Sequence, residues 1–146
     1  MTLTYHGLRG KPIIYAGVED VVTGRQFICE MFIDTGCYAT AFPAKYDRRF
    51  GHNNRHPKVA KGQSCGLGGK SKCFIHSVRI GLLDETEPVG DNGKPSFKWR
   101  AKCTKAEFIT KFNADYGIIG RDVMSEWRKL TIKNLNADHP LIEIVV

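Results

Sequence analysis

The chain of 146 residues contains no run of about 18 apolar residues, so a membrane-spanning helix is not expected. Its first residues, Met1 to His6, lack the basic and then apolar pattern of a signal peptide. Its five cysteines include no Cys-x-x-Cys pair, and an odd number cannot pair completely within one chain. We therefore expect reduced thiols in an intracellular protein, with no metal, no cofactor and no membrane partner. Release from a longer precursor stays open.

The composition favours one β-rich domain spanning residues 1–146. Apolar residues make up 42% of the chain and charged residues 25%, and fifteen glycines with six prolines supply many turns. The formal net charge of +7 would attract nucleic acid or an acidic partner. However, the basic residues are scattered and do not alternate with aromatic residues, so nucleic acid is not the expected partner. An acidic partner stays open.

One acidic residue stands where an apolar strand ends. Asp34 follows the apolar run 29–33 directly, and Thr35 and Gly36 follow it. A carboxylate at that place is costly unless it is hydrogen-bonded, paired or partly protonated, so it needs a chemical reason. Thr35 offers a donor and an acceptor, and Gly36 lets the backbone turn sharply. Asp-Thr-Gly is the active-site triplet of aspartic proteases, although chance alone produces Asp-Thr-Gly or Asp-Ser-Gly in about one chain of this length in ten to twenty.

Patterns on both sides of the triplet predict short strands. Residues 12–18 and 26–33 form a predicted hairpin whose second arm carries Asp34. Pro43 and Gly51 mark the expected start and end of a short helix. Residues 62–76 contain a glycine cluster between two strand-like arms, which is typical of a hairpin tip. That cluster precedes a strand pattern rather than the helix that a phosphate-binding P-loop requires.

The second half of the chain continues the β pattern. Residues 84–96 predict a surface loop, and 97–104 alternate as a strand with one basic face. Residues 116–127 pass from an apolar strand through Gly120 into a short amphipathic helix. Two strands, 129–133 and 141–146, end the chain. The last strand is so apolar that we expect it to be paired at an interface.

Three motifs in this order resemble the retropepsin family of retroviral-type aspartic proteases. They are Ile33-Asp34-Thr35-Gly36, the flap-like Gly66-Leu67-Gly68-Gly69, and Ile118-Ile119-Gly120-Arg121-Asp122. The resemblance covers residues 11–133, and the loop 84–96 is longer than in compact viral enzymes. It implies an all-β fold: a closed barrel of a single lobe with a flap hairpin and one or two short helices. It also implies an endopeptidase acting on a polypeptide substrate.

The resemblance assigns a role to each motif. Asp34 is the catalytic residue, Thr35 and Gly36 support the active-site loop, and the flap residues Gly66, Leu67, Gly68 and Gly69 close over the substrate. Candidate pocket walls are Ala41, Phe42 and Ile118. Gly120, Arg121 and Asp122 have structural roles near the site.

The chemistry needs two carboxylates, one accepting a proton from water and one donating a proton to the scissile carbonyl. The chain has only one such triplet, since Asp91-Asn92-Gly93 and Asp115-Tyr116-Gly117 lack the hydroxyl residue. The simplest solution is an isologous homodimer in which Asp34 meets its symmetry mate.

Two residues depart from the family pattern. Cys37 and Tyr38 follow the triplet where the family usually has Ala or Ser and, in many viral members, an acidic partner for the late arginine. The partner of Arg121 is therefore open, and the Cys37 thiol suggests sensitivity to oxidation. Two other readings also stay open: a catalytically silent peptide-binding or dimerisation module of the same fold, and a basic β-barrel that binds nucleic acid.

Overall fold

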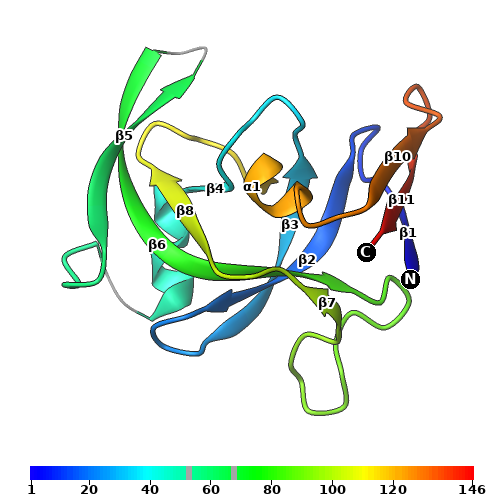
Figure 1. Cartoon of the computed structure of the whole chain (residues 1–146), viewed down its shortest axis with the longest axis horizontal. Helices are drawn as coiled ribbons and strands as arrows, with labels where there is room; N and C mark the ends of the chain where they lie inside the picture. Colours follow the sequence, from blue (N-terminus) through cyan, green and yellow to red (C-terminus); the bar gives the residue numbers. More distant parts are fainter. Residues whose placement is uncertain (52–53, 67–68) are drawn as a thin grey trace.

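The computed structural model describes residues 1–51, 54–66 and 69–146 and consists mainly of β-strands (Figure 1). The strands are β1 (Thr2–His6), β2 (Ile13–Asp20), β3 (Gln26–Ile33), β4 (Ala41–Pro43), β5 (Ala60–Gly66), β6 (Gly69–Leu83), β7 (Phe97–Arg100), β8 (Thr104–Ile109), β9 (Gly117–Ile119), β10 (Lys129–Lys133) and β11 (Leu141–Val145). The helices are the 3-10 helix η1 (Ala44–Phe50) and the α-helix α1 (Arg121–Met124). No helix among the described residues is both long enough and apolar enough to span a membrane.

Six strands close into a barrel. Their order is β2, β3, β9, β4, β8 and β6, and β6 returns to pair with β2 through the register Ala16↔Leu82 to Asp20↔Val78. Closure leaves no open edge around the ring, which is one way that β proteins avoid unpaired strands. The expected fold, a closed β-barrel with a hairpin and short helices, is confirmed.

Aromatic side chains fill much of the barrel core. Phe42, Phe50 and Phe108 are all fully buried, and the Phe42 and Phe108 rings stack with centroids 5.0 Å apart. Phe50 meets Phe108 edge to face at 4.9 Å. Phe50 comes from η1, which begins after Pro43 and ends at Gly51 in the left-handed conformation (φ 75°), as the sequence predicted.

The β5–β6 hairpin projects from the barrel at the upper left of Figure 1. Its antiparallel register runs from Ala60↔Ile75 to Gly66↔Gly69, in agreement with the predicted hairpin 62–76. The loop 84–96 projects elsewhere and is ordered by hydrogen bonds from Gly90 N to Lys94 O (2.8 Å) and from Ser96 N to Pro88 O (2.8 Å). It therefore forms a small β-turn structure on the barrel surface.

The two ends of the chain lie together in a separate three-stranded sheet (Figure 1). β11 is its central strand, paired with β1 on one edge and β10 on the other. We expected the apolar last strand to be paired at an interface, and the structure pairs both its edges with strands of the same chain. The pairing partner β1 was not predicted, although Leu3 and Tyr5 alternate with the polar residues Thr2, Thr4 and His6 as in a strand with one buried face.

Candidate active site

The loop 34–40 links two strands that are not neighbours in the barrel. It leaves β3 at Asp34 and enters β4 at Ala41, while β9 lies between those two strands. β9 pairs in parallel with β3 and antiparallel with β4, where Ala41 faces Ile118. The triplet therefore lies at the ends of three adjacent strands, β3, β9 and β4, which restrict the movement of the loop.

Asp34 is held by its backbone and left partly accessible at its carboxylate. Its N–H donates to Ile119 O (3.2 Å), and its own C=O accepts from Cys37 N (3.1 Å). Gly36 N donates to Asp34 Oδ1 at 2.9 Å. Within the described residues no donor lies within hydrogen-bonding distance of Oδ2, and the residue is half-buried. One carboxylate oxygen is thus fixed and the other is available.

Thr35 and Gly36 are exposed at the tip of the loop. A Cβ at Gly36 would lie 3.2 Å from Asp34 Oδ1, so a side chain there would press on the carboxylate. Both residues are accessible to solvent, and their role in supporting the loop stays a prediction.

The carboxylate of Asp122, at the start of α1, fixes the end of the loop at Thr40. It accepts hydrogen bonds from Thr40 N (3.1 and 3.0 Å), Thr40 Oγ1 (2.7 Å) and Thr104 Oγ1 (2.6 Å). It also accepts from Val123 N at 2.8 Å, and Thr40 Oγ1 in turn accepts from Gly120 N at 3.2 Å. Charge-assisted hydrogen bonds are the stronger kind, so this network joins the loop, β8 and α1 firmly.

Gly120 allows α1 to approach the loop. A Cβ at this position would lie 2.5 Å from Ala39 C and 2.7 Å from Tyr38 O, both backbone atoms. With that space free, Arg121 N donates to Cys37 O (2.9 Å) and Asp122 N donates to Tyr38 O (3.0 Å). The predicted structural roles of Gly120 and Asp122 fit these contacts, although the sequence did not indicate which groups they would meet.

Arg121 has an aromatic neighbour rather than an acidic one. Its guanidinium lies 5.8 Å from the centroid of the Tyr38 ring, a cation–π distance. Among the described residues no carboxylate lies within ion-pair distance of Arg121. Tyr38 is 71% exposed, the most exposed large apolar side chain of the described chain. The departure at Tyr38 thus replaces a possible ion pair with a weaker contact.

The Cys37 thiol is held in its protonated form. Burial raises the pKa of Cys37, and the negative charges of Asp34 and Glu107 raise it further. Cys37 Sγ donates to Ala39 O at 3.1 Å. Since the thiolate is the reactive species, these features argue against the oxidation hypothesis drawn from the sequence.

The predicted pocket walls are only partly accessible. Ala41 and Phe42 have exposed fractions of 1% and 0%, so their side chains offer no surface to a substrate in this structure. The prediction for these two residues, which was drawn from the resemblance, is corrected: every residue of β4 is buried inside the barrel. Ile118 is half-buried and can still line a surface. Of the flap residues, Gly66 and Gly69 pair at the end of the hairpin, while Leu67 and Gly68 lie outside the described residues.

Sequence reasoning missed Thr40 and Thr104. Thr40 is fully buried, and both hydroxyls donate to Asp122. A signal for Thr40 was present, because a hydroxyl residue beside an apolar strand needs a buried partner. Nothing in the sequence indicated that the partner would be 82 positions away.

No protein-family model and no curated protein sequence matches the chain. Among solved structures, it is similar to EIAV protease in complex with the inhibitor HBY-793, with a TM-score of 0.52 and 16% sequence identity, over 80% of this chain and 86% of that one. It is also similar to a retropepsin-like aspartic protease from Rickettsia conorii, with a TM-score of 0.58 and 12% identity, over 99% of this chain and 89% of that one. The chain has the fold of the retropepsin-like aspartic proteases, and the resemblance based on three motifs is confirmed at the level of the fold.

Proposed function

We propose that the protein is an aspartic endopeptidase whose active site combines Asp34 from two copies of the chain. The observation that carries the proposal is Asp34 itself: a half-buried carboxylate on a pinned loop, with Oδ1 held by Gly36 N at 2.9 Å. The loop is positioned by a network that includes Thr40 and Asp122 but leaves Asp34 Oδ2 without a partner among the described residues. A structural carboxylate would be expected to use both oxygens, as Asp122 does.

The chemistry follows from two such carboxylates a hydrogen bond apart. Two neighbouring carboxyl groups do not ionise together easily, so the pair shares one proton. The ionised Asp34 takes a proton from a water molecule, and the water oxygen attacks the scissile carbonyl carbon. The protonated Asp34 of the second copy gives its proton to the carbonyl oxygen. The C–N bond of the resulting tetrahedral intermediate then breaks, and the amine nitrogen leaves with the proton that the first Asp34 took from water. The protein thereby activates water without a metal or an organic cofactor.

The β5–β6 hairpin is the proposed flap. It extends beyond the barrel, and its strands end at Gly66 and Gly69. An extended peptide bound beneath such a hairpin would be recognised through main-chain hydrogen bonds, which are indifferent to side chains. Closure of the hairpin over the peptide would exclude water from the reaction.

The alternative is a catalytically silent module of the same fold that binds peptides or dimerises. The enzyme is favoured by the intact triplet and by the Oδ2 of Asp34, which accepts no hydrogen bond from the described part of the chain. A silent module would tolerate any residue that fills the place of Asp34, whereas the dyad requires a carboxyl group.

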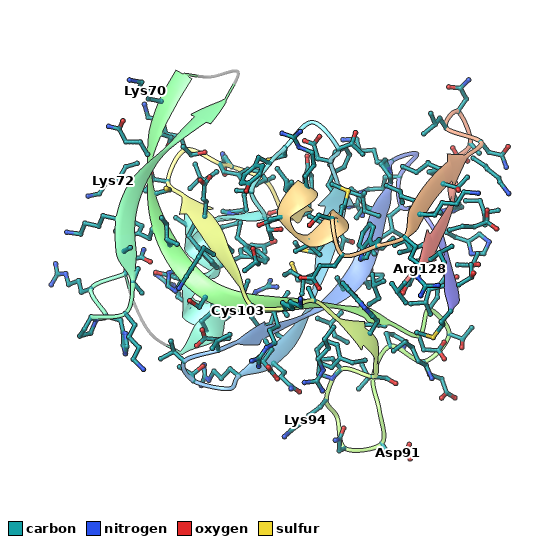
Figure 2. All side chains as sticks on the ribbon, viewed as in Figure 1. Lys70, Lys72, Asp91, Lys94, Cys103 and Arg128 are labelled. Atoms are coloured by element: carbon teal, nitrogen blue, oxygen red, sulfur yellow. The ribbon has the colours of Figure 1, made fainter. Side chains whose placement is uncertain are left out.

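The test compares the native protein with Asp34→Asn on a diverse peptide library at mildly acidic and neutral pH. We expect Asp34→Asn to abolish cleavage while the dimer stays folded in sedimentation analysis. The matched control is Asp91→Asn, which removes the carboxylate of an Asp-x-Gly look-alike on the exposed turn labelled in Figure 2. Specific activity should also fall on dilution. Cleavage retained by Asp34→Asn, or full activity in a monomer, would contradict the proposal.

A further inference from the structure

Three lysines lie on one face of the β5–β6 hairpin. Lys61 belongs to β5, Lys70 and Lys72 belong to β6, and all three are exposed. The register pairs Lys61 with Phe74, Gln63 with Lys72 and Cys65 with Lys70, and residues two apart on a strand share a face. Figure 2 shows Lys70 and Lys72 pointing away from the body of the molecule. We call Lys61, Lys70 and Lys72 the lysine face.

The charges of the lysine face are not neutralised within the described part of the chain, where no carboxylate lies within ion-pair distance of these ammonium groups. Two basic residues of β7, by contrast, are paired: Lys98 with Asp84 at 3.7 Å and Arg100 with Glu19 at 3.3 Å. Like charges on neighbouring strands repel one another and reduce stability. The lysine face therefore has a positive potential that a partner can neutralise.

The shape and composition of the lysine face indicate the kind of partner. A shallow groove of about 420 Å³ is lined by Lys61, Gly62, Gln63, Lys70, Ser71 and Lys72. None of these residues is aromatic. The same face carries Phe74 opposite Lys61, but this ring is half-buried and the Lys72 ammonium lies over it, 5.4 Å from its centroid. Surfaces for single-stranded nucleic acid usually combine positive charge with several aromatic rings on which bases stack. Lys70 and Lys72 are two residues apart on a strand, a repeat of about 7 Å. Alternate side chains of an extended polypeptide have the same repeat.

We propose that the lysine face docks an extended acidic segment of a partner polypeptide, with carboxylates at alternate positions opposite Lys70 and Lys72. Complementary charge provides the attraction and sets the register of the segment. The docking itself does not depend on catalysis. It rests on the proposed function only in one consequence: an acidic segment that flanks a cleavage site would tether the substrate to the hairpin.

The test measures binding of a fluorescein-labelled peptide of alternating Glu and Ser by fluorescence anisotropy, in the Asp34→Asn background so that no cleavage occurs. The variant Lys70→Glu/Lys72→Glu should weaken binding by about tenfold or more, since it replaces attraction with repulsion. The matched control, Lys94→Glu/Arg128→Glu, changes the net charge equally at exposed positions far from the hairpin, as labelled in Figure 2. It should change the affinity by less than about twofold.

Two results would overturn the proposal. One is an equal loss of affinity in both double variants, which would mean that only net charge matters. The other is tighter binding of a single-stranded oligonucleotide than of the Glu-Ser peptide at the same salt concentration, lost in Lys70→Glu/Lys72→Glu. The double variant Lys70→Gln/Lys72→Gln removes both charges without adding repulsion and should also weaken peptide binding. Circular dichroism spectra of each variant show whether it is folded, so a loss of binding can be distinguished from a loss of folding.

A second measurement uses the active protein and compares the KM of a cleaved peptide with and without the Glu-Ser extension. The extension should lower the KM of the native protein but not that of Lys70→Glu/Lys72→Glu. An equal KM in native protein with and without the extension would show that the bound segment does not tether substrate. If the native protein cleaves no peptide but still binds the Glu-Ser peptide, the result would count against the proposed endopeptidase activity and would still support docking at the lysine face.

Discussion

Thr40 and Asp122, 82 positions apart in the chain, form the contact that fixes the loop 34–40 to α1. The Thr40 hydroxyl donates to Asp122 Oδ1 at 2.7 Å, and Thr40 N lies 3.0 Å from Oδ2. Because Thr40 is fully buried, water cannot replace Asp122 as the hydrogen-bond acceptor of its hydroxyl and N–H groups. The geometry of Asp34 thus depends on a carboxylate that does no chemistry itself.

Replacing Asp122 with Ala should lower the free energy of unfolding by about 3 kcal/mol, because it leaves the buried donors of Thr40 and the half-buried hydroxyl of Thr104 unpaired. Asp122→Asn keeps one acceptor oxygen and should cost less, about 1 kcal/mol. Urea unfolding of both variants measures the difference. The exposed Asp138→Ala serves as control and should have little effect. Equal stabilities of Asp122→Ala and native protein would contradict the anchoring role.

The contact between Arg121 and Tyr38 should be weak but measurable. A double-mutant cycle of Tyr38→Ala and Arg121→Gln should give a coupling energy of about 0.5 to 1 kcal/mol, the usual range for an exposed cation–π pair. Tyr38→Phe should keep most of it, since the ring rather than the hydroxyl faces the cation. Strictly additive effects of the two substitutions on urea unfolding would show that the residues do not interact.

Cys37 should react slowly despite its place next to the triplet. Burial raises the pKa of Cys37, and the nearby Asp34 charge adds to the effect, so the thiolate fraction at neutral pH is small. Iodoacetamide should modify the exposed Cys103 several times faster than Cys37, and the two rates should converge in denaturant. Peptide mass spectrometry measures both rates. Faster modification of Cys37 would restore the oxidation hypothesis.

Glu19 should make stability dependent on pH in the acidic range. Its pKa is lowered from 4.5, chiefly by the hydrogen bond from Gln26 Nε2 (2.6 Å), with Arg79 and Arg100 adding to the effect. A lowered folded-state pKa gives stability that is fully present above the unfolded value and is lost as pH falls through the folded one. The stability advantage of native protein over Glu19→Gln should therefore be constant near neutral pH and shrink below pH 4.5.

Urea unfolding across this pH range measures that dependence. The exposed Glu87→Gln is a matched control and should follow the native protein throughout. An advantage over Glu19→Gln that grows on acidification would contradict the assignment. The result bears on function as well, because any acidic pH optimum must be reached while the fold is still stable.

Local patterns were enough to predict several elements. The apolar run before Asp34 became β3, and Pro43 with Gly51 bounded η1, because chain stiffness and the left-handed conformation are local properties. The three motifs predicted the fold through their order. Residues 97–104, by contrast, divide into β7 and the start of β8, and β8 as a whole was missed.

Long-range pairing was beyond the reach of those patterns. The central place of β11 depends on β1, at the opposite end of the chain, and not on the apolar character of β11 itself. The burial of Phe42 likewise depends on Phe50 and Phe108, which reach it only when the barrel closes.

The sequence by itself determined that an Asp-Thr-Gly triplet ends an apolar strand and that a glycine opens a late helix. Only the tertiary structure decided that Asp122 holds Thr40, that Arg121 faces Tyr38, and that one Asp34 oxygen has no donor among the described residues. The physical reason is that strand and turn preferences act between near neighbours, whereas hydrogen bonds to a buried carboxylate depend on distant segments brought together by closure of the barrel.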